Sequence, residues 1–306
     1  MPADDDGVTA TDSALVLQGF NEPKSLEALE LFADGRGGYY PQLWSTDKQP
    51  NKMVLDESCT HWCQADYATT CLVRALRQEA GLITTTTTEY LTEGMSSRSG
   101  LYFANPYLVD WVLARAIAQD ELAASLRSQL LAEILASMND DYSFGLYDQA
   151  LSTALAILSM AQLGYRGQEM RVAQLKLLEF MDQDGLLPKA TPFYSSLRLN
   201  SQLSDQAILG LLMAQTCSYG IKQKQIRQVE GECQSISLYE DTHSLITTAI
   251  AALAFSEPDS ATTPAPKYSD RRQQKIHPRY LCRNHSEYIA KFALPPYLAT
   301  KVELAV

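Results

Sequence analysis

The stretch NDDYSFGLYDQALSTALAILSMAQLG, residues 139–164, decides the fold of this chain. It opens with a polar turn that contains an aromatic residue and a glycine, passes through Asp148, and ends in a run of small and aliphatic residues. A helix that is apolar on every side cannot face water. The stretch therefore predicts a helix at 147–163 that neighbouring helices enclose.

Further stretches repeat this pattern of an acid followed by an apolar helix. They are SDQAILGLLMAQTC at 204–217, EDTHSLITTAIAALAF at 240–255 and the weaker ADYATTCLVRAL at 65–76. Several such helices in one chain predict an inner layer of helices. Their N-termini, and the acids at these ends, would then lie around one end of a shared cavity.

Amphipathic segments separate the apolar ones. In 120–138 the aliphatic positions recur at every fourth residue, and in 167–181 they recur at every third. The first set is Leu122, Leu126, Leu130 and Ile134, and the second is Val172, Leu175, Leu178 and Met181. Inner and outer helices thus alternate along the chain, with few strand signals, which predicts an all-α fold of antiparallel helical pairs.

Composition shifts predict the organisation of the chain. We expect a flexible N-terminal arm at 1–20, a single helical domain at 21–256 and a linker rich in Pro, Ser and Thr at 257–270. The tail at 271–306 is basic, and we expect it to dock on the acidic body. The Gly-, Pro- and aromatic-rich stretch 34–52 reads as a long loop.

The 306 residues carry a net charge of −11, which argues against general nucleic-acid binding because phosphates repel an acidic surface. No apolar run reaches the ~18 residues of a membrane span. The acidic start has no apolar leader segment. We therefore expect a cytoplasmic protein whose six cysteines are reduced, while nothing in the pattern indicates an oligomeric state.

The segment 139–158 resembles the repeat of squalene–hopene cyclases, other class II terpene cyclases and protein prenyltransferase β subunits, in which an Asp-Gly-Ser-aromatic-Gly turn precedes an Asp and a small-residue helix. MDQDGLLP at 181–188 is a fainter copy. The resemblance spans residues 60–256. It implies an α/α toroid, a barrel of apolar inner and amphipathic outer helices, in which the turn serves stability.

The resemblance also suggests a catalytic centre. Class II cyclases protonate an alkene with the central Asp of an Asp-x-Asp-Asp-Thr segment, and Leu238–Thr242 matches it at Asp241 and Thr242, with Glu240 as the central acid. Glu240 or Asp241 would donate the proton, and His243 would orient or reprotonate the donor. Candidate substrate-binding residues beside the inner-helix starts and in the cavity wall are Tyr147, Asp148, Asp205, Tyr239, Trp111 and Tyr107.

Simpler roles stand beside these. Asp66, Asp148, Asp205 and Asp241 all lie where a helix is expected to start, where an acid caps the helix and complements its dipole. Two groups could hold a metal, although their spacing does not require it. They are Cys59 with His61 and Cys63, and the tail residues His277, Cys282 and His285.

We therefore expect an enzyme of the cyclase, isomerase or lyase type in specialised metabolism. It would act on a small apolar substrate, isoprenoid or polyketide-like, by acid-initiated, redox-neutral cyclisation or rearrangement without a cofactor. One alternative is a binding or scaffold toroid that has lost the cyclase acid. Another is a carbohydrate-active α/α barrel, which requires two carboxylates facing each other across a cleft.

Overall fold

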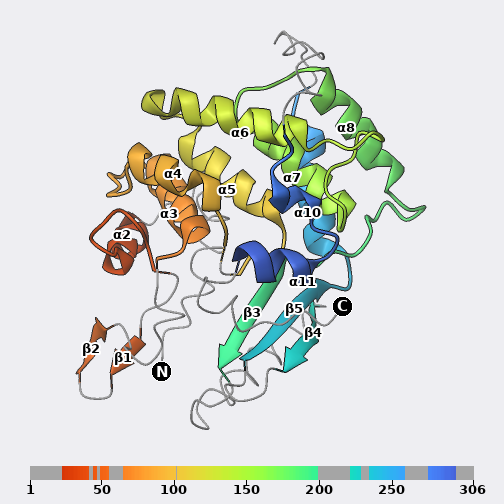
Figure 1. The fold of residues 1–306 in the computed structure, drawn as a ribbon. Coiled ribbons are helices and arrows are strands. Elements are labelled where there is room, and N and C mark those ends of the chain that lie inside the picture. The colour runs from red at the N-terminus through yellow and green to blue at the C-terminus, as the bar shows by residue number, and fades with distance from the viewer. Residues whose placement is uncertain are drawn as a thin grey trace. The chain divides into compact units, whose positions relative to one another are not determined.

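The computed structural model describes most of the chain, and its described part is mostly helical, in keeping with the predicted all-α class (Figure 1). The described ranges are 23–40, 44–46, 49–54, 65–100, 102–198, 221–228, 234–258 and 275–293. Four predictions lie wholly or mostly outside them, namely the arm at 1–20, the apolar segment 204–217 with Asp205, the group Cys59, His61 and Cys63, and the linker at 257–270. Within the described ranges, no helix is long and apolar enough to cross a membrane.

The chain divides into two compact units. The first comprises residues 1–100 and 112–127. Its elements are α2 (Pro23–Ala28), η2 (Leu29–Phe32), the hairpin strands β1 (Trp44–Thr46) and β2 (Gln49–Val54), α3 (Tyr67–Glu79), α4 (Thr88–Gly94), η4 (Met95–Ser97) and η5 (Glu121–Ala123). Its core packs Leu26 and Leu29 against Tyr39, Val73 and Leu76.

The second unit comprises residues 101–111 and 128–306, so that α5 (Pro106–Ile117) and α6 (Ala124–Ala136) contribute residues to both units. Its other helices are α7 (Gln149–Gln162), α8 (Gln168–Glu179), α10 (Leu245–Ser256), η7 (Pro278–Leu281), α11 (His285–Tyr288) and the π-helical turn η8 (Ile289–Ala293). The strands β3 (Phe193–Arg198), β4 (Ile221–Gln228) and β5 (Gln234–Asp241) form an antiparallel sheet in the order β3-β5-β4.

One turn conformation occurs three times, at residues 34–39, 139–144 and 182–187. In each turn the first residue donates its N–H to the carbonyl of the fifth at 2.9 Å. The fourth residue has a left-handed backbone in each, with φ of 103° at Gly37, 67° at Tyr142 and 78° at Gly185. These turns include the two copies of the repeat that the sequence predicts.

A threonine hydroxyl fastens each turn to an apolar helix. The sixth residue of each turn is buried, and its N–H donates to a threonine Oγ1 in the first turn and a half of α3, α7 or α10. The pairs are Tyr39 with Thr70 at 2.9 Å, Phe144 with Thr153 at 3.0 Å and Leu187 with Thr248 at 3.4 Å. We call these three threonines the latch threonines.

The strands lie between a turn and the helix that carries its latch threonine. The hairpin β1–β2 separates the turn at 34–39 from α3, and the sheet β3-β5-β4 separates the turn at 182–187 from α10. The sequence analysis predicts a loop at the first place and few strands anywhere. The helical repeat thus carries two strand-forming insertions, and only 139–164 runs from turn to helix without one.

The apolar helices differ in how deeply they are buried. Every residue of α7 from Ala150 to Ala161 is buried, as predicted. In contrast, α10 packs against α7 through one side while Leu245 and Leu253 are 60% and 48% exposed. The prediction that an apolar stretch is enclosed on every side therefore holds for α7 and is wrong for α10.

Candidate functional site

The acids at the predicted helix starts divide into two kinds. Asp66 caps α3, because its Oδ2 accepts from the N–H of Thr69 at 2.8 Å. Asp241 caps α10, because its two carboxylate oxygens accept from the N–H groups of Leu245 and Thr247 at 3.0 Å. Asp148 precedes α7 but makes no capping hydrogen bond with its side chain. Its carboxylate is thereby available for another partner.

The Asp148 carboxylate is instead held by two groups distant in sequence. Oδ2 accepts from the backbone N–H of Thr191 at 2.9 Å and lies 2.7 Å from Nε2 of His285. Asp148 has φ of 46° and ψ of 44°, a left-handed conformation that costs an L-residue free energy. Such strained positions cluster at functional sites, so the pair Asp148–His285 is the candidate site of the second unit.

Tyr147 completes the site. Its ring meets the imidazole of His285 edge-on, with centroids 4.5 Å apart and planes at 62°, and its hydroxyl donates to the carbonyl of Ala104 at 3.1 Å. Burial raises the pKa of Tyr147 well above its ordinary value, and nearby acidic groups raise it further. The phenol therefore keeps its proton and acts as a wall and an anchor for the imidazole.

His285 reaches Asp148 from the C-terminal segment. It opens the short helix α11, which Asn284 caps by accepting from the N–H of Glu287 at 2.9 Å. The side chains of His285 and Asp148 are 16% and 10% exposed, so the pair is nearly enclosed but still reachable from outside. A base that exchanges protons with a ligand needs this partial access.

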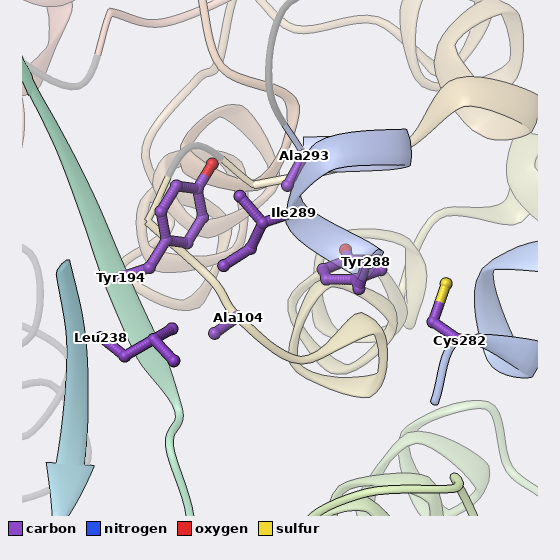
Figure 2. Packing of buried hydrophobic residues seen from close by; sticks show 7 residues of the cluster. All are labelled: Ala104, Tyr194, Leu238, Cys282, Tyr288, Ile289 and Ala293. Atoms are coloured by element: carbon purple, nitrogen blue, oxygen red, sulfur yellow. The ribbon is translucent and has the colours of Figure 1, made fainter. Parts of the chain in front are cut away.

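An apolar cluster borders this site (Figure 2). It joins Tyr194 and Leu238 of the sheet to Ile289 and Ala293 of η8. Tyr147 packs against this cluster. The members are Ala104, Tyr194, Leu238, Cys282, Tyr288, Ile289 and Ala293. Burial, together with the nearby charge of Glu287, raises the pKa of the Cys282 thiol to about 11, so Cys282 is a packing residue rather than a nucleophile.

The three residues expected to be catalytic lie in different environments. Glu240 lies half-buried on β5, Asp241 is 2% exposed with its carboxylate engaged on α10, and His243 is exposed to solvent. Besides Tyr147, the other two tyrosines expected to bind substrate also differ. Tyr107 is fully buried, with its hydroxyl donating to Ser137 Oγ at 3.0 Å, whereas Tyr239 is half-buried on β5.

The remaining expected residues fall elsewhere. Trp111 is half-buried on α5, and Asp205 lies outside the described residues. Among the described His, Cys, Asp and Glu residues, no group of three or more could hold a metal ion. Of the tail residues considered as ligands, His277 caps η7 through Nδ1 while His285 pairs with Asp148.

The sequence predicts only one member of the pair Asp148–His285 as part of a substrate site. Asp148 is predicted as a site residue, but His285 enters there only as a possible metal ligand. The capping pattern Asn284-x-x-Glu287 predicts a helix beginning at His285. However, nothing in that pattern indicates that this helix meets the start of α7.

No family model matches the chain, and no curated protein matches it. Among solved structures, it is similar to the crystal structure of a protein from Actinoplanes, with 18% identity and a TM-score of 0.57. The similarity covers 86% of this chain and 77% of that one. At this level of identity, the similarity concerns the fold alone.

Proposed function

We propose that the chain is a terpenoid-cyclase-like enzyme that rearranges or cyclises a small apolar substrate by redox-neutral proton transfer. The observation that carries this proposal is the pair Asp148–His285, joined at 2.7 Å beside the ring of Tyr147. The proton-transfer role falls to this pair, and Asp241 serves as the cap of α10.

The chemistry follows from how the imidazole is held. A carboxylate bonded to one ring nitrogen fixes the orientation of an imidazole and stabilises the imidazolium that forms when the ring takes up a proton. Nε2 of His285 faces Asp148, which assigns proton exchange with the substrate to Nδ1. The imidazolium of His285 would donate its Nδ1 proton to one carbon of the substrate, and the imidazole that results would take up a proton from another carbon, so no oxidant or reductant is needed.

An isoprenoid or polyketide-like substrate fits the surroundings of the pair. The neighbouring cluster is apolar, and aromatic faces of the kind that Tyr147 offers stabilise positive charge on carbon. The triple turn-and-latch repeat supports an α/α toroid of the cyclase and prenyltransferase type. In that architecture, the apolar helices that bear the latch threonines would be the inner ones.

The test compares variants on a panel of linear isoprenoid alcohols and polyenes. Wild-type protein should convert at least one of them to an isomer of the same mass. His285→Gln and Asp148→Asn should each lower the rate by about 100-fold or more, the range for loss of general acid–base catalysis. Glu240→Gln should leave the rate unchanged, and a Glu240→Gln protein that alone is inactive contradicts the assignment.

A second candidate is a toroid that binds an apolar molecule without converting it. The observation in its favour is that both carboxylate oxygens of Asp241 are engaged on α10, so one of the two acids expected to donate the proton has a structural task. Native mass spectrometry of the purified protein separates the candidates. A retained apolar ligand that stays unchanged during long incubation favours binding, whereas release of an isomer favours catalysis.

A further inference from the structure

A second buried contact holds the C-terminal segment six residues before His285. Arg279 and Asp110 are 1% and 0% exposed, and Arg279 Nη1 lies 3.3 Å from Asp110 Oδ1. Nη2 of Arg279 donates to the carbonyl of Pro106 at 2.8 Å, and the hydroxyl of Tyr280 donates to the other Asp110 oxygen at 2.8 Å. Three polar contacts thus join η7 to the first turns of α5.

A buried ion pair of this kind adds little net stability. Removing two charges from water costs about as much as their attraction returns, and apolar residues of similar size often serve stability as well or better. What the ion pair provides instead is a fixed register of the C-terminal segment. Because Asp110 meets Arg279 with one oxygen and Tyr280 with the other, only one register of the C-terminal segment satisfies the carboxylate.

The chain between Arg279 and His285 transmits this register. The Cys282 side chain is buried in the apolar cluster. The next residue, Arg283, donates its N–H to Glu287 Oε2 at 2.8 Å, and Asn284 caps the helix that His285 opens. A slip of one residue at Arg279 would therefore carry His285 away from Asp148.

We propose that Arg279 is a positioning residue whose ion pair with Asp110 sets the register of residues 278–288 and so places His285 on Asp148. Its importance for turnover rests on the proposed function, but the placement itself does not. The ion pair and the side-chain hydrogen bond of Arg279 go to Asp110 and Pro106, so Arg279 acts through the segment that carries His285.

The test reads the imidazole directly by NMR of protein with ¹⁵N-labelled histidine. His285→Gln identifies the His285 signals, and Asp148→Asn shows their position when the pairing is altered. The double variant Asp110→Leu with Arg279→Met leaves no lone buried charge, so we expect it to fold. Its His285 signals should move to the Asp148→Asn position. The control Arg283→Gln removes an exposed arginine from the same segment and should leave the signals in place.

A single variant provides the same test if the double variant does not fold. Arg279→Lys keeps the charge, but a single ammonium group lacks the fork that reaches both Asp110 and the Pro106 carbonyl. Its far-ultraviolet circular dichroism should match that of the wild type, while its His285 NMR signals should be displaced. Alkylation of Cys282 by iodoacetamide should be about tenfold faster, because the segment opens more often.

Either folded variant with His285 signals and Cys282 reactivity like the wild type would overturn the positioning role. No substrate is present in these measurements, so they remain readable if the proposed enzyme activity fails. Conversely, an unmoved His285 in the Arg279 variants overturns only the positioning role. The activity assigned to the pair would then stand or fall on the turnover of His285→Gln.

Discussion

The backbone N–H of Phe144 donates to the hydroxyl of Thr153 at 3.0 Å, and both residues are completely buried. This bond ties the turn of the most regular repeat to the second turn of α7. The equivalent bonds to Thr70 and Thr248 show that it is a recurring element of the fold. A buried hydroxyl without a hydrogen-bond partner costs free energy, and here the N–H of Phe144 supplies the partner of the Thr153 hydroxyl.

Thr153→Val should therefore destabilise the protein although valine has nearly the same shape. The change leaves the Phe144 N–H buried without a partner, which costs about 1–3 kcal/mol. Thr153→Ser keeps the hydroxyl and should cost less. Urea unfolding followed by circular dichroism measures both, and a valine variant as stable as the wild type would remove the latch from the account.

Asp241→Ala should lower stability by about 0.5–2 kcal/mol because α10 loses its cap. Asp241→Ser retains a short side-chain oxygen for the same N–H groups and should recover part of the loss. Thermal unfolding of the two variants measures the difference. If the alanine and serine variants are equally stable while only the alanine variant loses turnover, Asp241 has a chemical role and not a structural one.

Gly185→Ala should destabilise by about 1–2 kcal/mol through backbone strain alone. Gly185 has φ of 78°, and a Cβ at this position would meet no atom within 4 Å, so no steric clash adds to the cost. The unfolding free energy in urea gives the result. A loss below the experimental error would show that the left-handed position in the turn at 182–187 is not a determinant of stability.

Asp141 should make the stability depend on pH at the acid end. Burial alone would raise its pKa, but hydrogen bonds from the hydroxyl and N–H of Ser143 and from Lys176 lower it below the ordinary 3.8. The folded state thus binds this proton less readily than the unfolded state. The stabilisation is present above pH 3.8 and disappears as the pH falls through the lowered value.

The measurement compares wild type with Asp141→Asn. At pH 7 the variant should have the lower urea midpoint, and well below pH 3.8 the two midpoints should converge. The side chain is half exposed, so the difference is small and needs paired measurements. A difference that grows as the pH falls would contradict the assigned direction.

The sequence predicts the buried face of a helix where the apolar residues follow a single spacing. It fails where two different spacings of apolar residues overlap in one segment. In α6, Leu126, Leu130 and Ile134 are buried as predicted, while Leu122 precedes the helix and is 82% exposed. In α8 the predicted face is wrong. Each three-residue step drifts about 60° around a helix, whereas the apolar residues that are buried, Met170, Ala173 and Leu177, follow a step of three and then one of four.

The turn at 34–39 shows a different limit. Its glycines and Tyr39 predict a loop that packs against another part of the chain. Its structural similarity to the turn at 139–144 depends on backbone hydrogen bonds, which different sequences can make. The site is hidden for a related reason. Asp148 is identified by its place before α7, whereas His285 lies 137 residues later, and only tertiary contact joins them.

Deuterium transfer tests the central claim most directly. The wild-type protein, incubated in D₂O with the isoprenoid panel, should place deuterium on a carbon of the substrate, because the imidazolium exchanges its N–H protons with solvent before it donates one. His285→Gln should show no incorporation above the rate without protein, and Asp241→Ser should keep it. Equal incorporation by wild type and His285→Gln, or none by any of the three, would contradict proton transfer at the pair Asp148–His285.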